Sequence, residues 1–140
     1  MKHTGSAVWK GDLKSGTGTT STESGVLKDA PYGFNSRFEN GTGSNPEELI
    51  GAAHASCFSM ALSMVLGQAG FTPDEIATTA AVTLEKQGDG FGITKVHLTV
   101  EARVPGADDA AFQQAAESAK ENCPVSKLLN AEITMDAKRV

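Results

Sequence analysis

The chain has 140 residues, a net charge of -5 at pH 7 and only two cysteines. This length fits one domain, which we predict to span residues 1–140, and the acidic balance excludes non-specific nucleic-acid binding through a basic patch. Two cysteines are too few for a secreted disulfide scaffold or a four-cysteine zinc site. Because the first residues lead into no apolar run, we expect no signal peptide and predict a cytoplasmic protein.

The N-terminal part of the chain predicts a small sheet. Strand propensity is good over residues 7–10 and 13–22 despite several glycines. Residues 29–33 are predicted to form a turn or loop. Residues 34–38, with a phenylalanine at each end and one arginine between them, are expected to form another short strand. The expected result is a three-stranded antiparallel sheet.

A long helix is predicted between Asn45 and Gly70. Asn45 is a good N-cap, Pro46 suits the first helical position, and Glu48 is placed to complete a capping box. Gly70 is a helix stop signal. A helix of this length is a rod of roughly 36 Å, which is long for a small domain.

This helix carries no charged residue between Glu48 and Asp74. Its length would suit a membrane span, but His54, Gln68 and three serines make it weakly apolar, so we expect no membrane span. A helix that is apolar on every face and rich in small residues is typical of the buried axis of a soluble core. One chain of this length cannot easily surround such a helix, so a second subunit is expected to cover it.

The rest of the chain predicts a hairpin, two helices and a final strand. In chain order, the expected elements are a strand in the second half of residues 76–86, a turn at 88–90 and a strand over 91–104. They are followed by a helix that Asp108 or Asp109 caps and that ends near Asn122, a short helix over 125–129 and a strand over 131–140. The residue before a proline avoids helical geometry, so Cys123-Pro124 separates the two helices. Together with the N-terminal sheet and the long helix, this order predicts an α+β fold with segregated layers.

Cys57, in the middle of the long helix, is the main chemical feature of the sequence. A free cysteine is often only a small apolar residue in a packed helix, so position alone leaves the structural and functional interpretations open. Cys123 stands at a helix start, where the pKa of a thiol can be lowered. If the two cysteines meet, one thiolate can attack a peroxide and the other can trap the resulting sulfenic acid.

Other polar residues have simpler interpretations beside the functional ones. His54 and Cys57, three positions apart on one helix face, are candidate metal ligands, but no further ligand is indicated, so we predict neither a metal nor a cofactor. Arg37 is most simply a solvated strand residue, although an arginine held by a carboxylate can stabilise a thiolate. Glu47 and Glu48 are most simply acidic residues favoured by the helix dipole.

Several motifs carry a resemblance to a known family. They are Tyr32-Gly33-Phe34-Asn35, Arg37-Phe38, Asn45-Pro46-Glu47-Glu48-Leu49, Cys57-Phe58 and Cys123-Pro124-Val125-Ser126. The chain strongly resembles the osmotically inducible protein C and organic hydroperoxide resistance (OsmC/Ohr) family from Trp9 to the last strand, and is most similar to its OsmC subgroup. It departs from the organic hydroperoxide subgroup in one respect, because the arginine comes earlier there and residues 9–22 contain none.

The resemblance implies an intertwined homodimer of α+β subunits with two active sites at the interface. It implies a cysteine peroxidase that acts on organic hydroperoxides and, less well, on hydrogen peroxide, in oxidative and osmotic stress defence. Cys57 matches the peroxidatic cysteine and Cys123 the resolving one, while Arg37 and Glu47 match residues that support the thiolate. The implied partners are the hydroperoxide, an external dithiol reductant and a second copy of the chain, with no nucleic acid and no membrane.

Two alternatives from other functional classes stay open. One is a peroxide-responsive protein whose thiols only sense the oxidant, and the other is a metal-binding module built on His54 and Cys57. Rapid peroxide turnover with a dithiol distinguishes catalysis from sensing, and metal content after purification tests the module. For a peroxidase, an apolar pocket that includes Phe58 and Met60 is expected to hold an alkyl peroxide.

Overall fold

The structure is a computed structural model that describes all 140 residues. It contains six strands and four helices, which form two compact units over residues 1–49 and 50–140. The boundary falls within the long helix α2 (Pro46–Gln68). Each unit has its own three-stranded sheet, which confirms the predicted α+β class, whereas the single domain stays a prediction.

The first unit contains the predicted antiparallel sheet, but its third strand is not the predicted one. The strands are β1 (Gly5–Lys10), β2 (Thr17–Thr22) and β3 (Ala30–Tyr32), in the order β1-β2-β3. The prediction of a loop over residues 29–33 was wrong, because residues 30–32 pair with β2. Pro31 is tolerated in β3 because β3 is an edge strand.

The predicted strand over residues 34–38 is instead the short helix α1 (Phe34–Phe38). The hydroxyl of Ser36 closes this turn, because its Oγ accepts from Gly33 N–H at 3.0 Å and donates to Ser44 O at 2.7 Å. Phe34 and Phe38 are four positions apart, so a helix places them on one face, and their ring centroids lie 5.0 Å apart. The spacing of the two phenylalanines therefore fits a helix.

The second unit has a mixed sheet with β5 in its centre. Its strands are β4 (Glu75–Gln87), β5 (Gly90–Arg103) and β6 (Glu132–Arg139). β4 pairs with β5 antiparallel through the predicted turn, and β6 pairs with β5 in parallel. Alternate residues of β5 from Val96 to Ala102 are buried, so helices cover only one face of the sheet.

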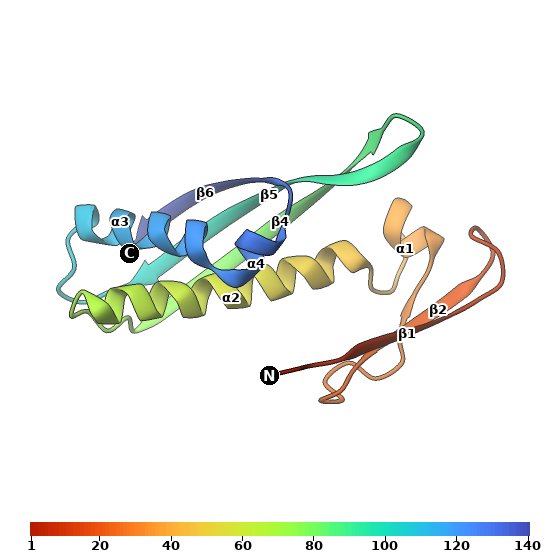
Figure 1. The fold of residues 1–140 in the computed structure, drawn as a ribbon, viewed down its shortest axis with the longest axis horizontal. Helices are drawn as coiled ribbons and strands as arrows, with labels where there is room; N and C mark the ends of the chain where they lie inside the picture. The colour runs from red at the N-terminus through yellow and green to blue at the C-terminus, as the bar shows by residue number, and fades with distance from the viewer. The chain divides into compact units, whose positions relative to one another are not determined.

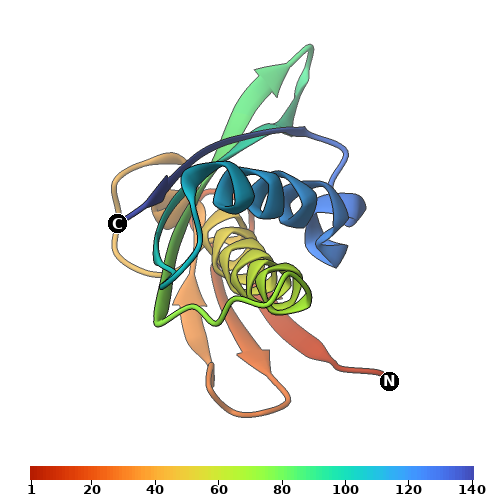
Figure 2. The same ribbon diagram turned by 90° about the vertical axis from the view of Figure 1, so that its left-hand side faces the viewer.

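The long helices pack on that one face of the second unit's sheet. Figures 1 and 2 show α2 and α3 (Asp109–Asn122) on the same side of β4, β5 and β6, with α4 (Pro124–Leu128) following α3. Phe112 from α3 and Phe58 from α2 are fully buried in the core. All the buried hydrophobic residues of the chain lie in this unit.

The predicted ends of α2 are confirmed by their backbone geometry. Asn45 Oδ1 accepts a hydrogen bond from Glu48 N–H at 2.8 Å, as an N-cap does. At the other end, Gly70 has a φ of 88°, and Phe71 N–H donates to Leu66 O at 2.9 Å. These features form a Schellman motif, in which glycine adopts the left-handed conformation at little cost.

α2 is buried on one face and exposed on another within the single chain. Phe58 and Leu62 are fully buried, whereas Met60 is 77% exposed and Met64 is 60% exposed. By length and composition alone α2 could also cross a membrane, and little of its apolar stretch is buried inside the chain. Burial of every face, and the absence of a membrane, therefore stay predictions.

Candidate active site

Cys57 lies midway along α2, beside the face that enters the core. The helical repeat turns His54 and Phe58 fully inward, and Cys57 is left partly exposed next to them. Phe58 and Met60, two positions apart, point to different sides of the helix, so Phe58 is buried and Met60 is exposed. The expected alkyl pocket containing both residues is therefore not formed within the chain.

Cys123 joins α3 to α4 and is fully buried. Pro124 keeps it out of helical geometry, with φ of -58° and ψ of 132°, so α3 ends there and α4 begins with Pro124. The sulfur serves as the N-cap of α4, because Cys123 Sγ accepts from Ser126 N–H at 3.5 Å. The predicted break between the two helices thus makes Cys123 the N-cap residue of α4, and the Ser126 N–H orients its sulfur.

The fold brings the two cysteines together. The Cys57 thiol donates a hydrogen bond to the Cys123 sulfur, and both cysteines are free thiols. The backbone N–H of Val125 also donates to sulfur in this pair. A disulfide between Cys57 and Cys123 would therefore form between residues that are already neighbours in the fold.

The two thiols differ in acidity. Burial raises the pKa of Cys57, and the neighbouring Cys123 raises it further as hydrogen-bond acceptor and by its charge, although Val125 N–H opposes this. Burial also acts against ionisation of Cys123, but hydrogen bonds from Ser126 and the Cys57 thiol outweigh burial and lower its pKa. The environment of the pair thus makes Cys57 the less acidic thiol and Cys123 the more acidic one.

His54 and Ser126 form a second contact between α2 and α4. His54 Nε2 lies 2.7 Å from Ser126 Oγ, and both residues are buried. Burial lowers the pKa of His54, so the ring is neutral. His54 Nδ1 is buried with no hydrogen-bond partner. No group of three or more His, Cys, Asp or Glu residues is placed to hold a metal ion, so the metal-binding alternative gains no support.

The other two predicted site residues pair within the first unit. Arg37 Nη2 donates to Glu47 Oε1 at 2.8 Å, and Arg37 Nε donates to the same carboxylate at 3.1 Å. Glu47 is only 8% exposed, so its carboxylate depends on this two-point contact. Arg37 also lies over the Phe38 ring at 5.3 Å. Glu47 stands in the first turn of α2, as its simplest interpretation has it, but Arg37 is paired with it and is not simply a solvated strand residue.

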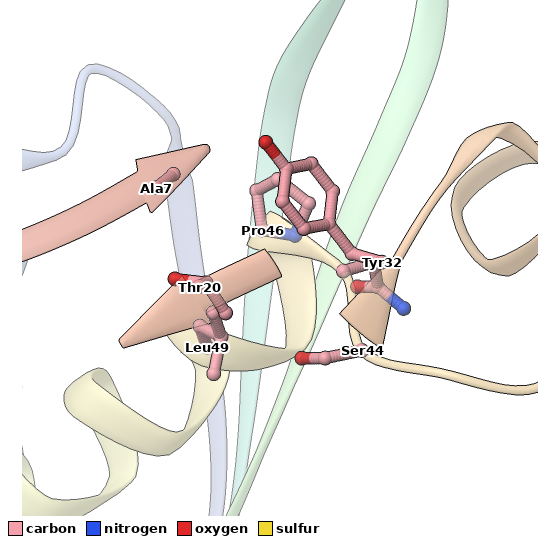
Figure 3. Close-up of a pocket in the computed structure, with 7 residues that line it drawn as sticks. Ala7, Thr20, Tyr32, Ser44, Pro46 and Leu49 are labelled. Carbon is pink, nitrogen blue, oxygen red and sulfur yellow. The ribbon is translucent and has the colours of Figure 1, made fainter. Parts of the chain in front are cut away.

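Two hollows lie in the first unit, and Arg37 lines one of them. One, of about 290 Å³, is lined by Trp9, Leu13, Tyr32, Gly33, Phe34, Arg37 and Phe38. The other, of about 180 Å³, lies between the small sheet and the start of α2, where Tyr32, Pro46 and Leu49 surround it (Figure 3). Both hollows are mainly apolar, and the first also contains the Arg37 side chain.

Comparison with known proteins identifies the family. A sequence model of OsmC-like proteins matches residues 39–138, well over half of the chain. The chain belongs to the OsmC-like family. Among OsmC-like proteins, it is 61% identical to "Peroxiredoxin OsmC" of Escherichia coli (strain K12) over 132 residues, which cover 94% of this chain and 92% of the relative.

More distant members of the OsmC-like family carry the other name predicted by the resemblance. The chain is 35% identical to the organic hydroperoxide resistance protein of Xanthomonas axonopodis pv. citri (strain 306) over 94 residues, covering 66% of this chain and 64% of the relative. The crystal structure of the organic hydroperoxide resistance protein OhrB of Bacillus subtilis matches with a TM-score of 0.75 at 29% identity, covering 96% and 98% of the two chains. The predicted family and fold are therefore confirmed.

Sequence reasoning missed the part played by Ser126. It stands in the motif Cys123-Pro124-Val125-Ser126, but no role was assigned to it. A detectable signal was present, because a residue before Pro at a helix start is an N-cap, and the N-cap side chain accepts from the N–H three positions later. That rule directs Ser126 N–H to the Cys123 sulfur, as the structure has it.

Proposed function

We propose that this OsmC-like protein is a thiol-dependent peroxidase that reduces organic hydroperoxides, and hydrogen peroxide less well, in oxidative and osmotic stress defence. The hydrogen-bonded pair of Cys57 and Cys123 is the observation that carries the proposal. The names of the Escherichia coli and Xanthomonas relatives, a peroxiredoxin and an organic hydroperoxide resistance protein, support the activity and the substrate class.

The reaction begins at Cys57. Its thiolate attacks one peroxide oxygen, the O–O bond breaks, and the alkoxide takes a proton to leave as an alcohol, which gives a sulfenic acid on Cys57. The Cys123 thiolate then attacks the Cys57 sulfur, the S–S bond forms, and the hydroxide that leaves is protonated to water. An external dithiol returns both cysteines to thiols by exchange. The lowered pKa of Cys123 suits the second step, because it favours the thiolate that attacks the sulfenic acid.

The first step needs a source of stabilisation for the Cys57 thiolate. Burial and the Cys123 charge both raise the pKa of Cys57, so the pair alone favours its protonated form. We assign Arg37 to this task, with Glu47 holding the guanidinium in one orientation through two hydrogen bonds. An arginine favours an ionised thiol by its charge and can polarise a peroxide oxygen.

We also propose that the protein acts as an intertwined homodimer in the cytoplasm. The exposed methionines of α2 and a first unit without buried hydrophobic side chains support this, because both leave apolar surface uncovered. Sedimentation is expected to show a dimer at micromolar concentration. A stable, well-folded monomer at that concentration would contradict the shared core.

Replacement of the nucleophile tests the peroxidase proposal. Cys57→Ser is expected to reduce consumption of tert-butyl hydroperoxide with a dithiol to the background rate while the protein stays folded, because serine forms no thiolate. Ser63→Ala, an exposed position of the same helix, is the matched control and should keep full turnover. Full activity of Cys57→Ser would exclude the mechanism, and one oxidation of the parent without repeated turnover would favour the peroxide sensor.

A further inference from the structure

Two side-chain links, three residues apart on each element, join α2 to the start of α4. One is the thiol pair of Cys57 and Cys123, and the other is the pair of His54 and Ser126. The earlier residue on α2, His54, pairs with the later residue on α4, Ser126, and Cys57 pairs with the earlier Cys123. The two pairs are therefore neighbouring links between the same two elements. Ser126 belongs to both, because its Oγ contacts His54 and its N–H donates to the Cys123 sulfur.

The geometry around His54 defines its hydrogen-bonding state. The ring is fully buried, its Nε2 contacts the serine hydroxyl at 2.7 Å, and its Nδ1 has no partner. A buried N–H without an acceptor is rarer than a buried acceptor without a donor. The proton therefore belongs on Nε2, which donates to Ser126 Oγ, and the lone pair of Nδ1 is the group left without a partner.

The two links respond differently to oxidation. The hydrogen bond between Cys57 and Cys123 uses the thiol hydrogen of Cys57, which is lost when this sulfur becomes a sulfenic acid. The hydrogen bond between His54 and Ser126 contains no sulfur, so it persists at that stage. At the moment when Cys123 must attack, the second link still holds α4 against α2.

We propose that His54 and Ser126 are positioning residues that hold Cys123 beside Cys57 for disulfide formation. The inference rests on the proposed peroxidase function for its biological meaning, but its physical content is the effective concentration of one thiol at the other. Without this link, α4 separates from α2 more often in the reduced and sulfenic forms. The disulfide prevents that separation, so its formation becomes both slower and less favourable.

Equilibrium with glutathione measures this effective concentration without any peroxide. The protein dithiol reacts with oxidised glutathione to give the protein disulfide and two reduced glutathione molecules, so atoms and electrons balance. Ser126→Ala removes the hydroxyl but keeps the N–H on the Cys123 sulfur, and His54→Asn shortens the side chain so that it no longer reaches Ser126. Each change should lower the equilibrium constant for the disulfide by roughly fivefold to tenfold, the worth of one buried hydrogen bond.

A matched control and a rescue separate positioning from general loss of stability. Ser59 lies on the same helix and makes a hydrogen bond of 2.8 Å to Thr78, so Ser59→Ala removes a similar bond that links α2 to β4 instead. It should leave the glutathione equilibrium unchanged. His54→Gln places an amide nitrogen near the position of Nε2 and should restore part of the loss. Because the link is one unit, Ser126→Ala should add little in a His54→Asn background.

One dose of tert-butyl hydroperoxide gives the second measurement. Formation of the Cys57 sulfenic acid should keep the parent rate in His54→Asn and Ser126→Ala, while its conversion to the disulfide slows by roughly fivefold to tenfold. Equal glutathione equilibria in these variants and the parent, or an equal fall in Ser59→Ala, would overturn the inference. If Cys57 of the parent does not react with peroxide, the peroxidase proposal fails, and the glutathione equilibrium still decides the positioning role.

Discussion

The two units of the chain are stabilised in different ways. The second unit, over residues 50–140, contains every buried hydrophobic side chain and also both cysteines. The first unit, over residues 1–49, buries no hydrophobic side chain, and its β1 is exposed along its whole length. Its best-defined contact is polar, the two-point pairing of Arg37 with the buried Glu47. Thiol chemistry thus lies on a packed core, whereas the charged pair lies on a unit with no core of its own.

The cysteine pair and the Arg37–Glu47 pair need different degrees of rigidity. Disulfide formation needs two sulfurs to meet within bonding distance, and a close-packed core supplies that rigidity. The role proposed for Arg37 is electrostatic, and a charge acts over a longer range than a covalent bond does. A segment of this size without a core is marginal alone, and it is typically completed by another surface. The contrast therefore connects the chemistry to the proposed dimer.

Among the changes that compare the two units, loss of the resolving thiol should have the largest effect on activity. Cys123→Ser should leave the first reaction with peroxide intact but end repeated turnover, because the Cys57 sulfenic acid then has no thiol of the same pair to trap it. Under repeated dosing, mass spectrometry should show sulfinic or sulfonic acid on Cys57 of this variant and not of the parent. Equal over-oxidation of both proteins would remove the resolving role from Cys123.

Two truncations test the difference in packing between the units. One removes a buried aromatic side chain of the second unit, and the other removes an exposed side chain of the first. Phe112→Ala should lower the free energy of unfolding by about 3–5 kcal/mol, because the ring is fully buried among core residues. Leu13→Ala should change it by no more than about 0.5 kcal/mol, because this side chain is 65% exposed. Denaturant unfolding measures both changes. Similar losses for the two variants would mean that Leu13 is covered in solution.

The charged pair of the first unit should contribute to both stability and reactivity. Arg37→Ala leaves the Glu47 carboxylate buried without its partner, so we expect a loss of about 1–2 kcal/mol, and not the silent change of a solvated arginine. The same variant should raise the pH at which iodoacetamide alkylates Cys57 and should slow the peroxide reaction. Arg37→Lys keeps a charge but not the planar fork, so it should rescue only in part. Unchanged alkylation and peroxide kinetics in both variants would return Arg37 to a structural role.

The smallest expected change is a shift in the titration of Cys57. Its pKa is raised first by burial and then by the Cys123 sulfur, which accepts its hydrogen and carries charge. Cys123→Ala removes both effects of the neighbouring sulfur, so the pKa of Cys57 should fall and the thiolate should appear at lower pH. The alkylation profile of Cys57 should move toward acidic pH relative to the parent. A profile that moves the other way would show that Cys123 does not raise the pKa of Cys57.

Local signals in the sequence predicted local structure well. The ends of α2 follow from Asn45, Pro46 and Gly70, whose preferences act within a few residues, and Pro124 likewise sets the break before α4. The error at residues 34–38 arose because five residues are too few to distinguish a strand from a helix by periodicity. There the hydroxyl of Ser36 favours the helix.

Contacts between residues that are distant in the sequence could not be predicted from composition and spacing. The meeting of Cys57 with Cys123 requires α2 and α4 to pack together, and the motifs of a known family, not periodicity, indicated it. The pairing of Arg37 with Glu47 depends on a loop between two helices, for which single-residue preferences give no information. The contact of His54 with Ser126 was not predicted for the same reason.

The central claim is that Cys57 and Cys123 of one chain form the peroxide-reducing pair. Its most direct test is a single equivalent of tert-butyl hydroperoxide added to the reduced protein, followed by peptide mapping under non-reducing conditions. We predict a disulfide that joins Cys57 to Cys123 within one chain, formed in proportion to the alcohol released and reversed by a dithiol. Release of alcohol with both thiols still free, or a disulfide only between different chains, would contradict the account.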